Sequence, residues 1–185
     1  MKKNDLLKPT LAAWLVLMGW INSSSAGGMA DCCIQFYKDA GYEQAFPLCR
    51  TASEQGDSHA QYILGKLYYF GKGIQQDYAE AVKWYLKAAE QGYAKAQFNL
   101  AVAYARGEGL LQSGGTAADW YYKAGLSYLK KGKKDNALRC VERIKYLKKS
   151  SDLSESKALL ADKLLTSIHG DVTSKTPSAP GKNQK

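Results

Sequence analysis

Histidine and acidic side chains are scarce in this 185-residue chain. It has 2 His and 17 Asp or Glu against 26 Lys or Arg, which leaves a formal net charge of +9. Neither His59 nor His169 has a Cys, Asp or Glu partner at the spacing of a metal site, so we expect no metal ligands. No nucleophile–base arrangement can be inferred either, and we therefore expect no catalytic residues, no cofactor and no enzymatic activity.

Long hydrophobic runs are also missing. The longest extends from Leu11 to Ile21, and its 11 residues fall well short of a membrane-spanning helix, which needs roughly 20. It follows a basic start and precedes small residues that end at Ala26, the layout of a secretory signal peptide. We therefore predict a signal peptide at residues 1–26, export to the periplasm or outside the cell, and no transmembrane segment after cleavage. Export disfavours a nucleic-acid partner.

Phosphate-binding loops are not expected. Two glycine pairs occur, in Gly71-Lys72-Gly73 and Gly107-Glu108-Gly109, but neither has the preceding strand and full glycine fingerprint that a phosphate cradle requires. They are interpreted as turn glycines, which end a helix and adopt backbone angles that other residues avoid.

The chain repeats itself with a period of 36 residues. Matching pairs 36 positions apart include Ala52/Ala88, Gln55/Gln91, Gln61/Gln97, Leu64/Leu100, Tyr68/Tyr104, Gly71/Gly107, Gly73/Gly109, Trp84/Trp120 and Lys87/Lys123. A fixed period of this length is typical of stacked repeats. Within each unit, apolar residues recur at three- and four-residue steps on either side of the glycine loop, which predicts a helix, a loop and a second helix running back. Small residues such as Gly65 and Ala101 allow the helices to approach closely. We predict an all-α fold, a short right-handed α-solenoid of stacked antiparallel helix hairpins.

The repeated pattern resembles the Sel-one-like repeat (SLR), a branch of the tetratricopeptide superfamily. The resemblance rests on Ala60-Gln61-x-x-Leu64-Gly65-x-x-Tyr68, on Gly71-x-Gly73-Ile74-x-x-Asp77 and on Ala81-x-x-Trp84-Tyr85-x-Lys87-Ala88-Ala89-x-Gln91-Gly92. It implies SLR units at 57–92 and 93–128. In the second, Leu111-Gln112-Ser113-Gly114-Gly115 replaces the usual acidic cap.

The flanks of these units match less closely. Residues 30–56 are interpreted as a degenerate first hairpin. Residues 118–149 resemble an ordinary tetratricopeptide hairpin that overlaps the preceding repeat, so the register of the helix at 117–131 stays open between the two. A C-terminal capping helix is expected at 153–169 and a disordered tail at 170–185.

Export makes the four cysteines disulfide candidates before metal ligands. Folding the first hairpin places Cys32 or Cys33 opposite Cys49, and one of the two is predicted to bond Cys49, which would add roughly 3 kcal/mol of stability. The alternative is three buried thiols. Cys140 lies too far along the chain to join them, and is either free or bridged to another molecule.

Positive charge concentrates in residues 118–149, which hold ten Lys or Arg and three acidic residues. A basic patch is predicted at the turn within this segment, at Lys130, Lys131, Lys133 and Lys134. It is either a solvated rim or a contact for an anionic partner such as an acidic protein, a cell-wall polymer or lipid headgroups.

Ligands of related repeats lie along the first helices of successive units, on the concave face. The corresponding partner-binding candidates here are Tyr62, Lys66 and Tyr69, with Phe98, Val102 and Arg106 as their counterparts in the second unit. Aromatic and cationic side chains make good interface anchors. Packing between repeats is the alternative role for the same residues.

The resemblance implies an exported repeat scaffold that binds another protein or peptide in an adaptor, regulatory or host-contact role. One alternative is an envelope protein that holds anionic cell-wall polymer or lipid through the basic patch. Another is a cell-wall or β-lactam hydrolase, an activity suggested for secreted relatives, for which the sequence offers no nucleophile and base.

Overall fold

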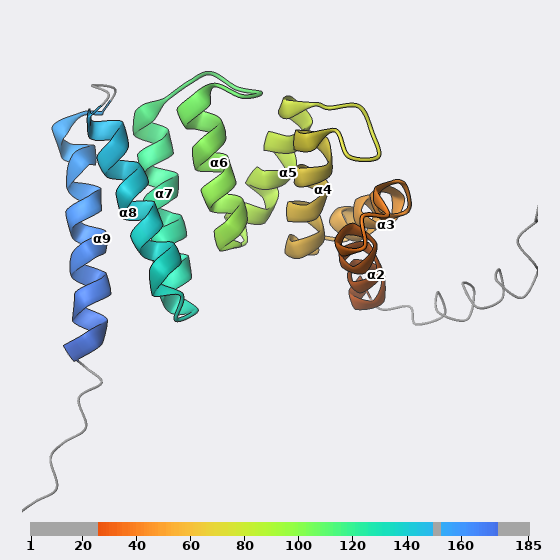
Figure 1. Ribbon diagram of the computed structural model, residues 1–185, viewed down its shortest axis with the longest axis horizontal. Coiled ribbons are helices and arrows are strands. Elements are labelled where there is room, and N and C mark those ends of the chain that lie inside the picture. Colours follow the sequence, from red (N-terminus) through yellow and green to blue (C-terminus); the bar gives the residue numbers. More distant parts are fainter. Residues whose placement is uncertain (1–25, 150–152, 174–185) are drawn as a thin grey trace, which may run out of the picture. The chain divides into compact units, whose positions relative to one another are not determined.

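The computed structural model describes residues 26–149 and 153–173, and all regular structure in these ranges is α-helical (Figure 1). The helices are α2 (Ala26–Lys38), α3 (Tyr42–Glu54), α4 (Ser58–Phe70), α5 (Tyr78–Glu90), α6 (Ala94–Arg106), α7 (Gly114–Lys130), α8 (Lys134–Lys149) and α9 (Glu155–Thr173). The predicted all-α fold is confirmed. No helix in the described ranges has the length and apolar character needed to cross a membrane.

Both ends of the helical region extend beyond the expected boundaries. The first described helix, α2, begins at Ala26 rather than near residue 30, and the predicted signal peptide otherwise lies outside the described residues. The last helix runs to Thr173, so the expectation of disorder from Gly170 onward is wrong for residues 170–173. A single glycine costs a helix about 1 kcal/mol but neither removes a hydrogen bond nor clashes, so it need not end the helix. The rest of the predicted tail, residues 174–185, lies outside the described part of the chain.

The chain divides into two compact units, an N-terminal unit (residues 1–76) and a C-terminal unit (residues 77–185). In the N-terminal unit α2 packs on α3, and α4 packs on both. In the C-terminal unit each helix from α5 to α9 packs on the next, and α7 also packs on α9. Helix α7 therefore pairs with α6 and with α8, which answers the question of register: it is the second helix of one hairpin and the first helix of the next.

Alanine dominates the buried positions, as close helix packing requires. The core of the C-terminal unit contains Ala101, Ala117, Ala118, Ala124 and Ala137, with larger side chains such as Tyr121, Ile144 and Leu164 between them. Gly125 continues this pattern, because a Cβ atom there would come within 2.3 Å of a Leu164 methyl group. Small residues thus set the distance between α7 and α9.

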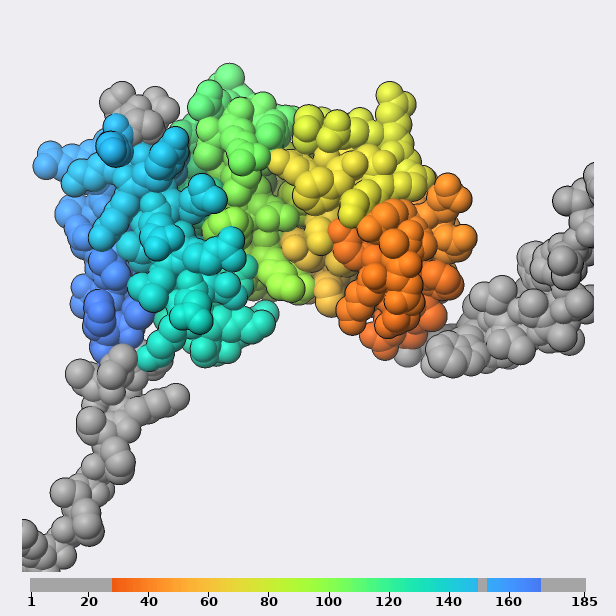
Figure 2. All heavy atoms as spheres, in the orientation of Figure 1, coloured from red at the N-terminus to blue at the C-terminus, as the bar shows by residue number. Residues whose placement is uncertain are grey.

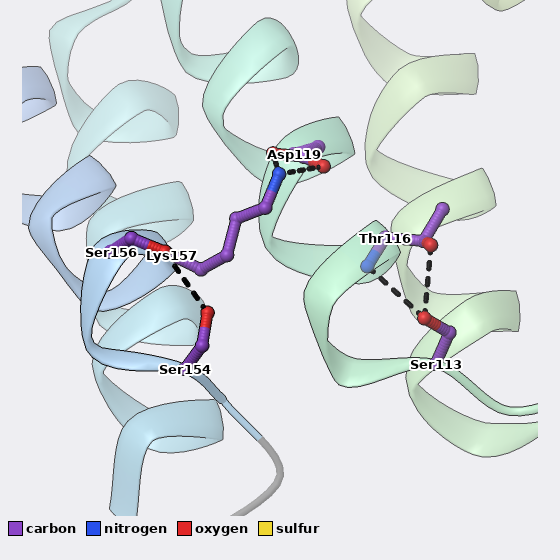
Figure 3. A network of polar contacts seen from close by, with 6 residues as sticks. All are labelled: Ser113, Thr116, Asp119, Ser154, Ser156 and Lys157. Carbon is purple, nitrogen blue, oxygen red and sulfur yellow. Dashed lines mark hydrogen bonds and ion pairs between the residues drawn. The ribbon is translucent and has the colours of Figure 1, made fainter.

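Polar contacts also connect α7 and α9 near their first turns (Figure 3). Lys157 of α9 reaches across to the carboxylate of Asp119 in α7 and forms an ion pair with it.

The first turn of α7 is capped by Ser113, whose hydroxyl accepts a hydrogen bond from the Thr116 backbone N–H at 3.2 Å. Asp77 caps α5 in the same way, because its carboxylate accepts a hydrogen bond from the Glu80 backbone N–H at 2.9 Å. Ser113 therefore does for α7 what Asp77 does for α5. The cap is preserved although its acidic residue is lost.

The second glycine of each predicted turn has a role beyond its backbone angle. A Cβ atom on Gly73 would lie 2.7 Å from the Tyr42 carbonyl oxygen, and one on Gly109 would lie 2.3 Å from the Tyr78 carbonyl oxygen. Tyr42 and Tyr78 begin α3 and α5, and they are 36 positions apart, as the two glycines are. Each glycine loop therefore rests directly on the first turn of an earlier helix in the same unit of the fold.

Candidate partner-binding surfaces

Buried glutamines make the same contact in both repeats. The Gln61 side-chain amide donates a hydrogen bond to the Ser53 carbonyl oxygen at 3.1 Å, and Gln97 donates to the Ala89 carbonyl oxygen at 3.0 Å. Both side chains are buried. Because an unsatisfied amide in the core would cost about 1–3 kcal/mol, each bond fixes the first helix of a repeat against the end of the preceding helix.

Loop glutamines make a second recurring contact. Gln76 donates from its side-chain amide to the Tyr69 carbonyl oxygen at 2.7 Å, and Gln112 donates to the Ala105 carbonyl oxygen at 3.0 Å. These carbonyls belong to the last turns of α4 and α6, where helix carbonyls lack partners within the helix. The last turns of α4 and α6, the helices that carry the candidate residues, are therefore bonded to the following loop in the same way in both repeats.

Each repeat also carries a tryptophan covered by a lysine on its second helix. The Lys87 amine lies 4.1 Å from the Trp84 ring centroid, and the Lys123 amine lies 4.2 Å from the Trp120 ring centroid. The lysine follows the tryptophan by three positions, a spacing that places both on one side of a helix. The recurrence explains why Trp and Lys are among the residues that define the repeat.

In the N-terminal unit, the predicted partner-binding residues join a cluster of aromatic rings and lysines. The Lys66 amine lies 4.5 Å from the Tyr37 ring centroid and 5.6 Å from that of Tyr62. Tyr69 instead contacts Phe70, at 4.8 Å between ring centroids. Tyr62, Lys66 and Tyr69 are all half-buried, so the structure brings Tyr62 and Lys66 into contact and places Tyr69 against a different ring.

Lys72 belongs to the same cluster, a role that its position between two turn glycines does not indicate. Its amine donates a hydrogen bond to the Tyr42 hydroxyl at 2.9 Å and lies 5.8 Å from the ring centroids of both Tyr37 and Phe70. The hydrogen bond with Tyr42 is the main cause that raises the pKa of Lys72. Lysines thus lie over the aromatic rings of α2, α3 and α4, where cation–π attraction holds them.

In the C-terminal unit, Phe98 and Val102 are half-buried and pack against the core, whereas Arg106 is exposed. The Phe98 ring meets the buried Tyr121 ring edge-on at 5.2 Å between centroids. Arg106 forms an ion pair with Glu108 at 3.5 Å. Phe98 and Val102 therefore take part in packing between helices, and the role of the three residues in partner binding stays a prediction.

The basic patch lies at the turn between α7 and α8. Lys130, Lys131 and Lys133 are exposed, and Lys134 is half-buried. Lys131 reaches toward the start of α6, where its amine lies 5.5 Å from the Tyr93 ring centroid.

Two cations on α8 are missing from the predicted site. Arg139 lies over Phe98, with its guanidinium carbon 5.7 Å from the ring centroid, and Arg143 follows one turn later. In the sequence, both arginines contribute only to the charge surplus of residues 118–149. The 36-residue period compares equivalent positions, and it contains no signal for a contact between residues 41 positions apart.

The cysteines divide into one disulfide and two thiols. Cys33 of α2 and Cys49 of α3 are joined by a disulfide, with their Cα atoms 4.8 Å apart, while Cys32 is free and half-buried. Of the two pairings that the sequence leaves open, the structure contains Cys33–Cys49. Cys140 is free and fully buried, and desolvation raises its pKa to about 12, so it stays a neutral thiol at physiological pH. Its burial leaves no access for a bridge to another molecule.

Metal-binding chemistry finds no support in the described part of the chain, where no three His, Cys, Asp or Glu side chains are grouped as metal ligands would be. The described surfaces instead contain aromatic rings with Lys or Arg side chains over them, carried by a set of packed helices.

Comparison with known proteins shows which family these helical repeats resemble. A family model described as "Sel1 repeat" matches residues 58–93 and 94–127. The chain carries Sel1 repeats. The matched segments agree with the predicted SLR units to within one residue at each boundary. The Sel1-like repeats predicted from the sequence are therefore confirmed for these two segments. Sel1 repeats generally serve as scaffolds for protein–protein interaction and are typically non-catalytic.

Relatives of the Sel1 repeats occur in plants and bacteria. The ERAD-associated E3 ubiquitin-protein ligase component HRD3A of Arabidopsis thaliana is 35% identical over 75 residues, which are 40% of this chain and 10% of the plant protein. This chain therefore matches about a tenth of the length of that curated relative.

Two solved structures share the fold. A Sel1 repeat protein from Oxalobacter formigenes is 33% identical, with a TM-score of 0.58, over 76% of this chain and 54% of the other. A protective antigen present in uropathogenic Escherichia coli strains, which displays an SLR fold, is 21% identical, with a TM-score of 0.63, over 89% of this chain and 36% of the other. The SLR repeat fold predicted from the sequence is confirmed.

Proposed function

We propose that the chain is an exported scaffold that binds a partner protein or peptide in an adaptor or regulatory role, through the exposed side of α4 in the N-terminal unit and, as a separate surface, the exposed side of α6 in the C-terminal unit. The observation that carries the proposal is that cations lie over half-buried aromatic rings at these helices, as Lys66 of α4 does over Tyr62 of α4 and Tyr37 of α2. Such side chains supply large contact areas with little loss of conformational freedom. The glutamine bonds that recur in both repeats keep the supporting helices in place.

The disulfide supports export. Structural disulfides persist in oxidising compartments and are rare in the cytosol, and Cys33–Cys49 joins the first two helices of the described chain. One relative is described as a component of a ubiquitin ligase, which is compatible with a scaffold role.

Site-specific photo-crosslinking in the native host tests the proposal. A benzophenone amino acid replaces Tyr62 or Val102 on the proposed surface, and Trp120 on α7 serves as the control position. We expect the protein in the envelope fraction, with protein adducts from the first two positions and few from the third. Adducts from Trp120 alone, or equal adducts from all three positions, would contradict the proposed surface. Recovery of the chain in the cytosol with Cys33 and Cys49 reduced would contradict export.

An envelope protein that binds anionic polymer is the second candidate. The exposed lysines of the basic patch favour it, because they form a concentrated positive surface with few acidic neighbours in sequence. Retention on isolated cell walls that is lost at high salt, and lost when the patch lysines are replaced by Gln, would support this candidate over the protein scaffold.

A further inference from the structure

We propose that the surface between α6 and α8 binds an acidic peptide segment of a partner protein, in which carboxylate and apolar side chains alternate. The proposal rests on the scaffold function and specifies the kind of partner. The α6–α8 surface consists of Phe98, Val102 and Arg106 on α6 and of Arg139, Arg143 and Tyr146 on α8.

The first step is the contact between the two helices. Arg139 extends from α8 to the Phe98 ring on α6, and Phe98 in turn rests on Tyr121. In Figure 2 the green atoms of α6 adjoin the cyan atoms of the α7–α8 segment on the face drawn. A guanidinium that lies over an aromatic ring still exposes N–H groups, which match the two oxygens of a carboxylate. The ring limits the freedom of Arg139, so less entropy is lost when a carboxylate binds.

The second step is the convergence of further cations on the same place. Burial raises the pKa of Tyr121 to about 12, while the positive charges of Arg143 and Arg106 act in the opposite direction. Arg106 pairs with Glu108. Arg139 and Arg143 form no ion pair with any carboxylate in the part of the chain that the structure describes. Their charges are therefore available to an anionic ligand.

The third step separates a peptide from a bare polyanion. The α6–α8 surface is only partly cationic, since Phe98 and Val102 are half-buried and the Tyr146 side chain is 66% exposed. A polyphosphate or polyol phosphate chain has no apolar groups to cover these side chains. A peptide with both acidic and apolar side chains matches both parts of the surface.

The spacing of the residues indicates how the peptide lies. Arg139 and Arg143 are four residues apart on α8, and Phe98 and Val102 are four apart on α6, which corresponds to about 6 Å along each helix axis. Alternate residues of an extended chain are separated by about 6.6 Å and point to the same side. An extended segment along the two helices therefore directs every second side chain toward the arginines and the others toward Phe98 and Val102.

Fluorescence anisotropy with a labelled peptide of alternating Glu and Val, eight to ten residues long by design, tests the proposal on the full mature chain. The Arg139→Gln/Arg143→Gln variant is expected to weaken binding about tenfold or more, as the loss of two charge-assisted contacts implies. The matched control is Lys148→Gln/Lys149→Gln, which removes the same charge from exposed positions at the end of α8 and should change the affinity less than about threefold, the screened effect of distant charge. Unchanged circular dichroism shows that both variants are folded.

Any of four results would overturn the proposal. Equal losses in the two variants would mean non-specific attraction to the charge of α8. Tighter binding of polyphosphate than of the peptide, with the same dependence on Arg139 and Arg143, would mean that the surface serves an anionic polymer. Binding of the Gln-for-Glu peptide as tightly as the acidic one would mean that the carboxylates are not recognised. If the peptide fails while photo-crosslinking at Val102 still captures a protein, the acidic partner is wrong and the scaffold function stands.

Discussion

Two glycines with nearly the same backbone angles have different neighbours in this protein. Gly92, between α5 and α6, has φ +78° and Gly109, between α6 and α7, has φ +74°. A Cβ atom on Gly92 would meet nothing within 4 Å, whereas one on Gly109 would collide with the Tyr78 backbone. Substitutions at these two glycines therefore measure two different losses of stability. Gly92 reports the cost of a left-handed backbone angle alone, and Gly109 adds the cost of losing a close contact with the Tyr78 backbone.

Replacing each glycine with alanine is expected to give two different losses of stability. Gly92→Ala should lower the free energy of unfolding by about 1–2 kcal/mol, the cost of holding a Cβ-bearing residue in the left-handed region. Gly109→Ala should cost about 1–3 kcal/mol more, because the α6–α7 loop must move off the first turn of α5. Urea unfolding followed by circular dichroism measures both. Equal unfolding midpoints would show that the loop does not depend on this contact.

At the scale of helices and hairpins, the sequence predicts the structural features that recur in both repeats. It does not predict contacts that occur only once. The 36-residue period predicts the repeats and their glycine turns, because each has the same local requirements. It does not reveal that Gln97 donates a hydrogen bond to the Ala89 carbonyl. The recurrence of glutamine at positions 61 and 97 is the signal in the sequence that indicates a shared role. The period cannot place Arg139 over Phe98, since that contact depends on how two hairpins pack.

The first hairpin shows the same limit. Neighbouring residues on a helix point about 100° apart, so only one of Cys32 and Cys33 can face α3. Which one does is decided by how the helix packs, and Cys33 lies on the buried side with Ala30. The sequence therefore predicts the disulfide and its hairpin but leaves the partner of Cys49 open.

Removing the disulfide is expected to weaken the first hairpin markedly. It joins residues 16 positions apart, for which the restriction of the unfolded chain corresponds to about 3 kcal/mol. The Cys33→Ala/Cys49→Ala variant should lose about that much unfolding free energy under oxidising conditions. Cys32→Ala, which changes a free and half-buried thiol beside the bond, should remain close to the parent protein. If both variants unfold at the same urea concentration, the bond does not stabilise the hairpin.

At the scale of the whole molecule, the disulfide and the α6–α8 surface belong to different compact units. Cys33 and Cys49 lie in residues 1–76, and every residue of the α6–α8 surface lies in residues 77–185. Arg139 contacts Phe98 of α6, which rests on Tyr121 of α7, and α8 itself packs on α7 and α9, all of them helices of the C-terminal unit. Recognition of the acidic peptide at the α6–α8 surface is therefore expected not to depend on the disulfide, which lies in the other unit.

This separation predicts that loss of the disulfide leaves recognition unchanged. In the full-length Cys33→Ala/Cys49→Ala variant, at a temperature where circular dichroism shows the chain folded, the affinity for the alternating Glu–Val peptide should stay within about twofold of the parent, because none of the charges or rings that meet the peptide has moved. Adding Arg139→Gln and Arg143→Gln to that variant should weaken the peptide as much as in the parent. A large loss of affinity on removing the disulfide alone would mean that the first hairpin takes part in binding, and that the partner contacts more of the chain than the surface between α6 and α8.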